Sequence, residues 1–109
     1  MKPTAIAYLR SDISTAQNWE EIQMRSLAKR YGYDLAKTIV FTPRTPDPIT
    51  QLITVVLRTG SEAVFIPHLG HLGAEVPTVL VRTCDVITMD DKTTYARSYF
   101  GLGGRQVNP

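Results

Sequence analysis

Four short apolar runs, separated by segments with helical spacing, constrain the fold of this chain more than any other feature. The runs cover residues 4–10, 35–42, 63–67 and 85–89. The first is continuously apolar, which is typical of a strand covered on both faces. The alternation predicts a βαβαβαβ order and an α/β fold. We expect a four-stranded, mostly parallel sheet flanked by helices, in the three layers of a Rossmann-like or flavodoxin-like domain.

The segments between the runs predict three helices, at residues 18–31, 48–58 and 74–83. In the first two helices, apolar residues recur near the spacing that places them on one face. The side chains expected to face the core are Trp19, Ile22, Leu27 and Tyr31 in the first helix and Ile49, Leu52, Ile53 and Val56 in the second.

Residues that begin and end helices stand at the boundaries of these segments. Asn18 and Glu21 have the spacing of a capping box at the start of the first helix, and Gly32 is suited to end it. Asp47 followed by Pro48 predicts the start of the second helix.

The end of the last apolar run marks the boundary between a domain and a C-terminal tail. We expect one α/β domain over residues 1–91 and a tail over residues 92–109 that is partly helical or disordered. Within the tail, Tyr95 and Tyr99 have the spacing of one helical turn, and the glycines that follow them oppose its continuation.

Composition indicates a cytoplasmic protein with no membrane span and no cofactor. The net charge of +2 does not by itself indicate nucleic-acid binding. The single cysteine, Cys84, cannot form an internal disulfide and is expected to be a small buried residue. No apolar run reaches the roughly 18 residues that a membrane span needs.

Polar residues follow the first predicted strand, where α/β sheets bind and process phosphates. Tyr8 and Arg10 end the strand, and Ser14 and Gln17 follow in the next loop. Simpler interpretations exist, because a loop serine often caps a helix and Arg10 has the spacing to pair with Asp12.

This pattern resembles the N-terminal catalytic domain of the serine recombinases, the resolvase/invertase family, over residues 4–91. The matching positions are Tyr8 and Arg10, then Ser14, Thr15 and Gln17, then Ile22 and Gln23, and finally Leu72 and Gly73 after the third strand. We expect the tail to contain neither the long dimerising helix nor the DNA-binding domain of that family.

The resemblance implies a chemistry for these positions. Ser14 would attack a DNA phosphate to form a phosphoserine link, with Tyr8 and Gln17 in the same site. Arg10 would stabilise the transferring phosphoryl group, and Arg10, Ser11 and Arg44 are the candidate phosphate-binding residues.

Several positions depart from the family pattern. Asp12 stands where the family places its serine, which moves the candidate nucleophile to Ser14. After the third strand, Gly70, His71 and Ala74 replace an aspartate and two arginines, so His71 is a vestigial site residue. One arginine on a phosphoryl group can contribute about 10³–10⁵ in rate, so we expect little or no catalysis.

Three hypotheses of function follow. The first is a standalone, catalytically inactive resolvase-like domain, a dimeric binding or regulatory module that acts with DNA or a DNA-binding protein. The second is a minimal active recombinase that uses Ser14, and the third is a small phosphate- or nucleotide-binding domain. The apolar residues expected to form a dimer face are Val55, Leu57, Tyr95, Tyr99 and Phe100.

The histidines and the basic residues of the first predicted helix suggest two further kinds of site. His68, His71 and Glu75 fall short of the three or four well-spaced ligands of a zinc site, so no metal is expected. A basic face on the first helix is expected to be solvated, with contact to a phosphate backbone as the alternative. Its residues are Arg25, Lys29 and Arg30.

Overall fold

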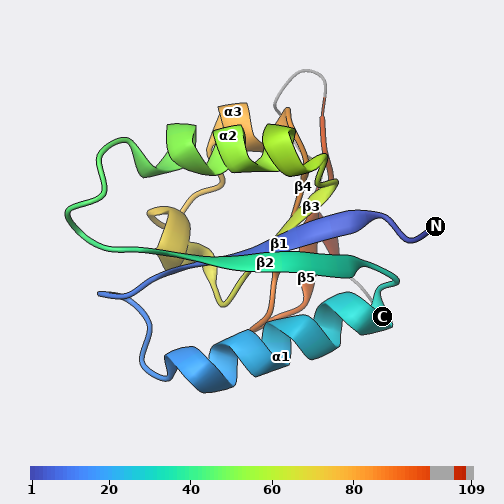
Figure 1. Cartoon of the computed structure of the whole chain (residues 1–109), viewed down its shortest axis with the longest axis horizontal. Helices are drawn as coiled ribbons and strands as arrows, with labels where there is room; N and C mark the ends of the chain where they lie inside the picture. The colour runs from blue at the N-terminus through green and yellow to red at the C-terminus, as the bar shows by residue number, and fades with distance from the viewer. Residues whose placement is uncertain (99–104, 108–109) are drawn as a thin grey trace.

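A six-stranded sheet with helices on both faces forms the molecule (Figure 1). The computed structural model describes residues 1–98 and the backbone of residues 105–107. The strands are β1 (Thr4–Arg10), β2 (Asp34–Phe41), β3 (Ala63–Ile66), β4 (Asp85–Thr88), β5 (Thr93–Tyr95) and β6 (Arg105–Val107). The helices are α1 (Gln17–Arg30), α2 (Pro48–Thr59) and α3 (Thr78–Val81), with a short 3₁₀ helix η1 (Leu69–Leu72).

The order of the strands is β2-β1-β3-β4-β5-β6. β1 pairs in parallel with β2 and β3, and β3 pairs in parallel with β4, so the predicted parallel sheet is confirmed. Figure 1 shows α1 on one face and α2 and α3 on the other, which confirms the three-layer α/β class. The 2-1-3-4 order matches flavodoxin-like sheets, whose strand order reverses between β1 and β3.

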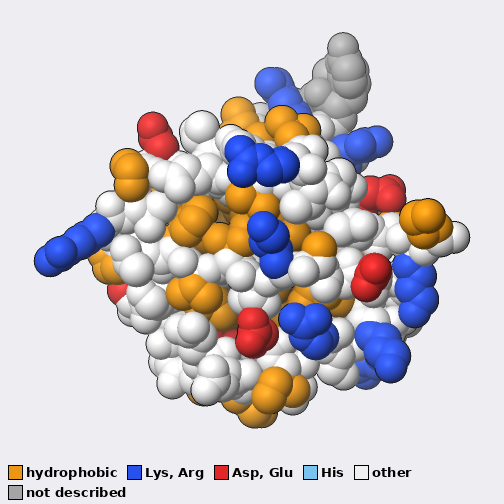
Figure 2. Space-filling view, in the orientation of Figure 1, with side chains coloured by type: hydrophobic (Ala, Val, Ile, Leu, Met, Phe, Trp, Pro, Cys, Tyr) orange, Lys and Arg blue, Asp and Glu red, His pale blue; other side chains and the backbone are white. Residues whose placement is uncertain are grey.

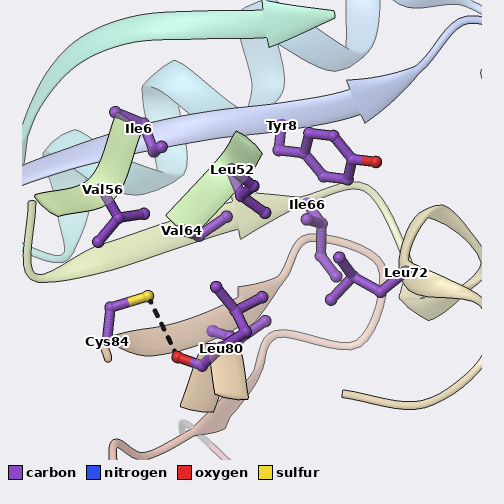
Figure 3. Close-up of a cluster of buried hydrophobic side chains, with 10 residues drawn as sticks. Ile6, Tyr8, Leu52, Val56, Val64, Ile66, Leu72, Leu80 and Cys84 are labelled. Carbon is purple, nitrogen blue, oxygen red and sulfur yellow. Dashed lines mark hydrogen bonds between the residues drawn. The ribbon is translucent and has the colours of Figure 1, made fainter. Parts of the chain in front are cut away.

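Two apolar cores lie on the two faces of the sheet, because successive side chains of β1 point in opposite directions. Ala5, Ala7 and Leu9 pack with α1, whereas Ile6 and Tyr8 pack on the side of α2 and α3. Figure 3 shows the second core, in which Tyr8 lies among side chains of three elements: Leu52, Val64, Ile66 and Leu72. Coverage of both faces explains why the first strand is apolar throughout.

Helix α1 is rotated relative to the sequence prediction. Trp19 and Ile22 are 57% and 63% exposed, so their predicted place in the core is wrong, whereas Leu27 is buried as expected. The buried face also includes Glu20 and Met24. The helix begins at Gln17 after an Ala16 cap with no side-chain hydrogen bond, so the capping box predicted for Asn18 and Glu21 is wrong.

Helix α2 agrees closely with its prediction. It begins at Pro48, buries Leu52 and Val56, and ends at Gly60 in a left-handed conformation that a glycine adopts without strain. Asp47 occupies the predicted cap position, but it has a left-handed backbone and makes no side-chain cap hydrogen bond.

The third helix and the segment after β4 differ from their predictions. The helix expected at residues 74–83 is shortened to α3, because Ala74 has a left-handed backbone (φ 75°) and Pro77 is the extended cap residue. The helical turn expected at Tyr95 is instead β5, which pairs antiparallel with β4 and extends the predicted four-stranded sheet. β6 then pairs antiparallel with β5.

The proposed apolar dimer patch is only partly present on the described surface. Val55 and Tyr95 are partly buried against the core, whereas Leu57 is 69% exposed. Tyr99 and Phe100 lie outside the described residues. In the part of the chain that the structure describes, every helix is too short or too polar to cross a membrane.

Candidate functional site

The carboxyl ends of β1 and β3 define the place where a flavodoxin-like sheet would bind a ligand, since the strand order reverses there. Residues 11–16 follow β1, and residues 67–72, which include η1, follow β3. The backbone N–H of Arg10 donates a hydrogen bond to Nδ1 of His71 at 2.9 Å. This bond joins the two strand ends across the point of reversal.

The His71 side chain is only 1% exposed. Because Nδ1 accepts a hydrogen bond, the neutral ring carries its proton on Nε2, which is buried and has no partner among the described residues. Burial, and then the neighbouring His68, lower the pKa of His71 from 6.5 to about 4. His71 is therefore uncharged at neutral pH and supplies no positive charge to an anion.

The guanidinium of Arg10 faces a carboxylate. Its Nε and one terminal nitrogen donate to the two oxygens of Asp12 at 3.2 and 2.8 Å. The pairing with Asp12, one of the simpler interpretations of the sequence, is thus present. This bidentate geometry engages two of the guanidinium nitrogens and pairs the positive charge that a phosphate would need.

Ser14 also faces a carboxylate. Its hydroxyl donates a hydrogen bond to Oε1 of Glu20, and its backbone N–H bonds the carbonyl of Arg10 at 2.9 Å. Glu20 is only 6% exposed and was missed by the sequence analysis. The sequence contains a signal for its burial. Glu20, Met24 and Ala28 follow one another at intervals of four residues, so they share the face of the helix that packs on the core.

Tyr8 is a core residue. Its side chain is fully buried, its ring meets Phe41 edge-on at 5.4 Å, and burial raises the pKa of its hydroxyl. Figure 3 shows the ring among apolar side chains, with the hydroxyl toward the carboxyl end of the strand. This hydroxyl has no hydrogen-bond partner among the described residues.

The remaining site residues of the prediction are at the surface. Ser11 is exposed, and its backbone N–H bonds the carbonyl of Phe41 at 2.9 Å. Gln17, the first residue of α1, is exposed. Arg44 is exposed in the loop after β2, and within the described residues its guanidinium makes no ion pair and no hydrogen bond to Ser14.

His68, His71 and Cys84 make contacts within the fold. Nδ1 of His68 accepts the N–H of Gly70 at 3.1 Å, and the two histidine rings meet edge-on at 4.7 Å. No group of three metal-ligating side chains gathers among the described residues. Cys84 is fully buried, its thiol donates to the carbonyl of Leu80 at 3.8 Å (Figure 3), and burial raises its pKa to about 12.

The fold is a three-layer α/β domain in which His71 links the carboxyl ends of β1 and β3 through its hydrogen bond with the Arg10 backbone. In comparisons with known proteins, no family model and no curated protein matches this chain. The resemblance to serine recombinases therefore depends on the residues named above. At this edge, the Ser14 hydroxyl is hydrogen-bonded to the Glu20 carboxylate, and the Arg10 guanidinium is paired with the Asp12 carboxylate.

Proposed function

We propose that this chain is a serine-recombinase-like domain that does not transfer phosphoryl groups and acts as a dimeric binding or regulatory module in a DNA-related context. One observation carries the proposal: the two residues that would handle a phosphate, Ser14 and Arg10, each hold a carboxylate instead. A phosphodiester approaching Ser14 would meet Glu20 and Asp12, and like charges repel at such distances.

The magnitudes support the loss of catalysis. Phosphoryl transfer depends mainly on positioning and on cations around the developing charge, and one arginine contributes about 10³–10⁵ in rate. Here Arg10 is paired, His71 is neutral, and Ala74 has no charge to offer. These losses leave the site far from the requirements of strand cleavage.

A second candidate function is a minimal recombinase, and the bond between Ser14 and Glu20 favours it. A carboxylate that accepts the proton of a serine hydroxyl is an arrangement that can activate a nucleophile. In that reaction, Ser14 Oγ would bond to phosphorus as its proton passed to Glu20, the bond from phosphorus to the sugar oxygen would break, and the leaving sugar oxygen would take a proton from water. The missing cations argue against this function.

The proposed dimer would use the layer of α2 and α3. Leu57 of α2 and Val79 of α3 are exposed apolar side chains on this layer, and Figure 2 shows hydrophobic side chains over α2. Sedimentation at micromolar concentration tests this part. We expect a dimer that Leu57→Lys converts to a monomer, whereas a monomeric parent protein contradicts it.

Trapping of a covalent intermediate tests the proposed loss of catalysis. Nicked, supercoiled and mixed-sequence duplex DNA would be incubated with the protein and analysed on denaturing gels, with Ser14→Ala as the matched control. We expect no adduct from either protein. An adduct that disappears in Ser14→Ala would establish the recombinase function instead.

A further inference from the structure

A groove of about 320 Å³ lies along α1 and is not lined by Arg10, Ser14 or His71. It lies between α1 and the turn that joins β4 to β5. Its volume falls within the usual range for small-ligand sites. The side chains that form it are Trp19, Gln23, Leu27, Arg30, Met89, Asp90 and Lys92.

The α1 side chains of the groove form a continuous stripe. Trp19, Gln23, Leu27 and Arg30 follow one another at intervals of four, four and three residues, so they share one face of the helix. Trp19 is 57% exposed, and its indole offers an accessible aromatic surface at one end of this stripe. Exposed aromatic rings beside cations are the usual means of binding single-stranded nucleic acids, because every base can stack on them.

The charges around the groove are mainly positive. Arg30 is exposed and forms no ion pair within the described residues, and Lys92 lines the opposite side. A second groove, of about 220 Å³, continues the basic surface with Lys2, Arg25 and Lys29. Figure 2 shows Lys and Arg side chains gathered over the C-terminal half of α1.

The length of the stripe identifies an elongated ligand. At 1.5 Å per residue, the Cα atoms of Trp19 and Arg30 are about 16 Å apart. One base does not span that distance, whereas a strand with successive phosphates does. Asp90 adds a carboxylate that can accept a hydrogen bond from an N–H group of a base.

We propose that the α1 groove binds a short segment of single-stranded nucleic acid. A base stacks on Trp19, and the phosphates that follow it contact Arg30 and Lys92. The proposal goes beyond the inactive carboxyl edge, because the groove shares no residue with Ser14, Arg10 or His71. Covalent trapping at Ser14 and binding at Trp19 can therefore succeed or fail separately.

Tryptophan fluorescence provides a direct test, since Trp19 is the only tryptophan of the chain. The full chain would be titrated at low salt with a ten-residue oligothymidylate, with a mixed-sequence duplex and with 5′-AMP. We expect saturable quenching by the oligothymidylate, weaker binding of the other two ligands, and an affinity that falls as salt rises.

Variants on the same helix locate the phosphate contact. We expect Arg30→Ala to weaken oligothymidylate binding about fivefold or more, because one charge-assisted contact is lost. Arg25→Ala removes the same charge from α1 but lines the other groove, so it should have a smaller effect. With a dye-labelled strand and anisotropy as the readout, Trp19→Ala should weaken binding about tenfold.

Several results would overturn the proposal. These are an absence of saturable quenching by millimolar oligothymidylate, binding of the duplex or of 5′-AMP at least as tight as that of the single strand, and equal effects of Arg30→Ala and Arg25→Ala. Circular dichroism of each variant separates a lost contact from a lost fold.

Discussion

At the carboxyl edge of the sheet, the guanidinium of Arg10 holds Asp12, whereas along the α1 groove Arg30 has no ion-pair partner among the described residues. The aromatic residues of the two regions differ in the same way. Tyr8 is fully buried in a core, and Trp19 is largely exposed beside a groove. At the edge, the side chains of Arg10 and Ser14 are hydrogen-bonded within the chain, whereas in the groove Trp19 and Arg30 are exposed to a partner.

The comparison shows that residues that match a family pattern need not be the residues that are accessible to a ligand. The residues that match a family pattern, such as Tyr8, Arg10 and Ser14, contribute to packing and to internal hydrogen bonds. Leu27 of the groove belongs to the core, but Trp19 and Arg30 are exposed, so their side chains are open to a ligand. If the comparison is correct, substitutions at the edge should change stability and substitutions in the groove should change binding.

The largest expected effect comes from His71→Ala. The substitution leaves a cavity at a buried position and removes the acceptor of the Arg10 N–H, so we expect a loss of about 2–4 kcal/mol in the free energy of unfolding. Urea denaturation followed by circular dichroism measures this loss.

Trp19→Ala is the matched control in the groove. It removes a larger side chain, but one that is mostly exposed, so the free energy of unfolding should change by less than about 1 kcal/mol. If Trp19→Ala destabilised the protein as much as His71→Ala, the contrast between the two regions would be lost.

Most of the fold could be predicted from the sequence, because the parallel strands are short and mostly apolar, with clear breaks between them. Helix α2 was equally clear, since Pro48 and Gly60 mark its ends and its apolar stripe is regular. β5 was missed because three residues, Thr93–Tyr95, carry too little periodicity to distinguish a strand from a turn.

The candidate site was only partly predictable, because some of its hydrogen bonds join residues that are far apart in the sequence. The bond between Arg10 and Asp12 is local in sequence and was weighed as an alternative, but the bond between Arg10 and His71 joins residues 61 positions apart. The rotation of α1 was missed because Trp19 and Ile22 are as apolar as the residues that are buried. The inward face of α1 is instead formed by Glu20, Met24, Leu27 and Ala28.

Acidification should destabilise the folded chain through His71. Because the folded pKa of His71 is lowered to about 4, the unfolded chain binds more protons than the folded chain between about pH 4 and 6.5. The free energy of unfolding should therefore fall on acidification across this window, by up to about 3 kcal/mol, and the full contribution should be present above pH 6.5.

Urea denaturation at pH 7.0, 5.5 and 4.5 measures this dependence, and His71→Gln should make it shallower because the glutamine does not titrate. His68→Gln keeps the bond to Arg10 but removes the neighbouring histidine that helps to lower the pKa of His71, so it should reduce the pH dependence less than His71→Gln does. Equal pH profiles for the parent protein and His71→Gln would contradict the assignment.

Among the substitutions expected to destabilise the carboxyl edge, Ser14→Ala should have the smallest effect. This substitution leaves the buried carboxylate of Glu20 without its donor, which should cost about 1–2 kcal/mol, whereas Thr15→Ala at the exposed neighbouring position should change stability by less than about 0.5 kcal/mol. Urea denaturation of both variants measures the difference.

A second background shows whether charge is the cause of that effect. Glu20→Gln keeps an acceptor for Ser14 but removes the charge, and a neutral acceptor loses less when its donor is removed. Ser14→Ala should therefore cost less in the Glu20→Gln background than in the parent protein. An equal cost in both backgrounds would mean that packing, and not the carboxylate, determines the role of Ser14 at this edge.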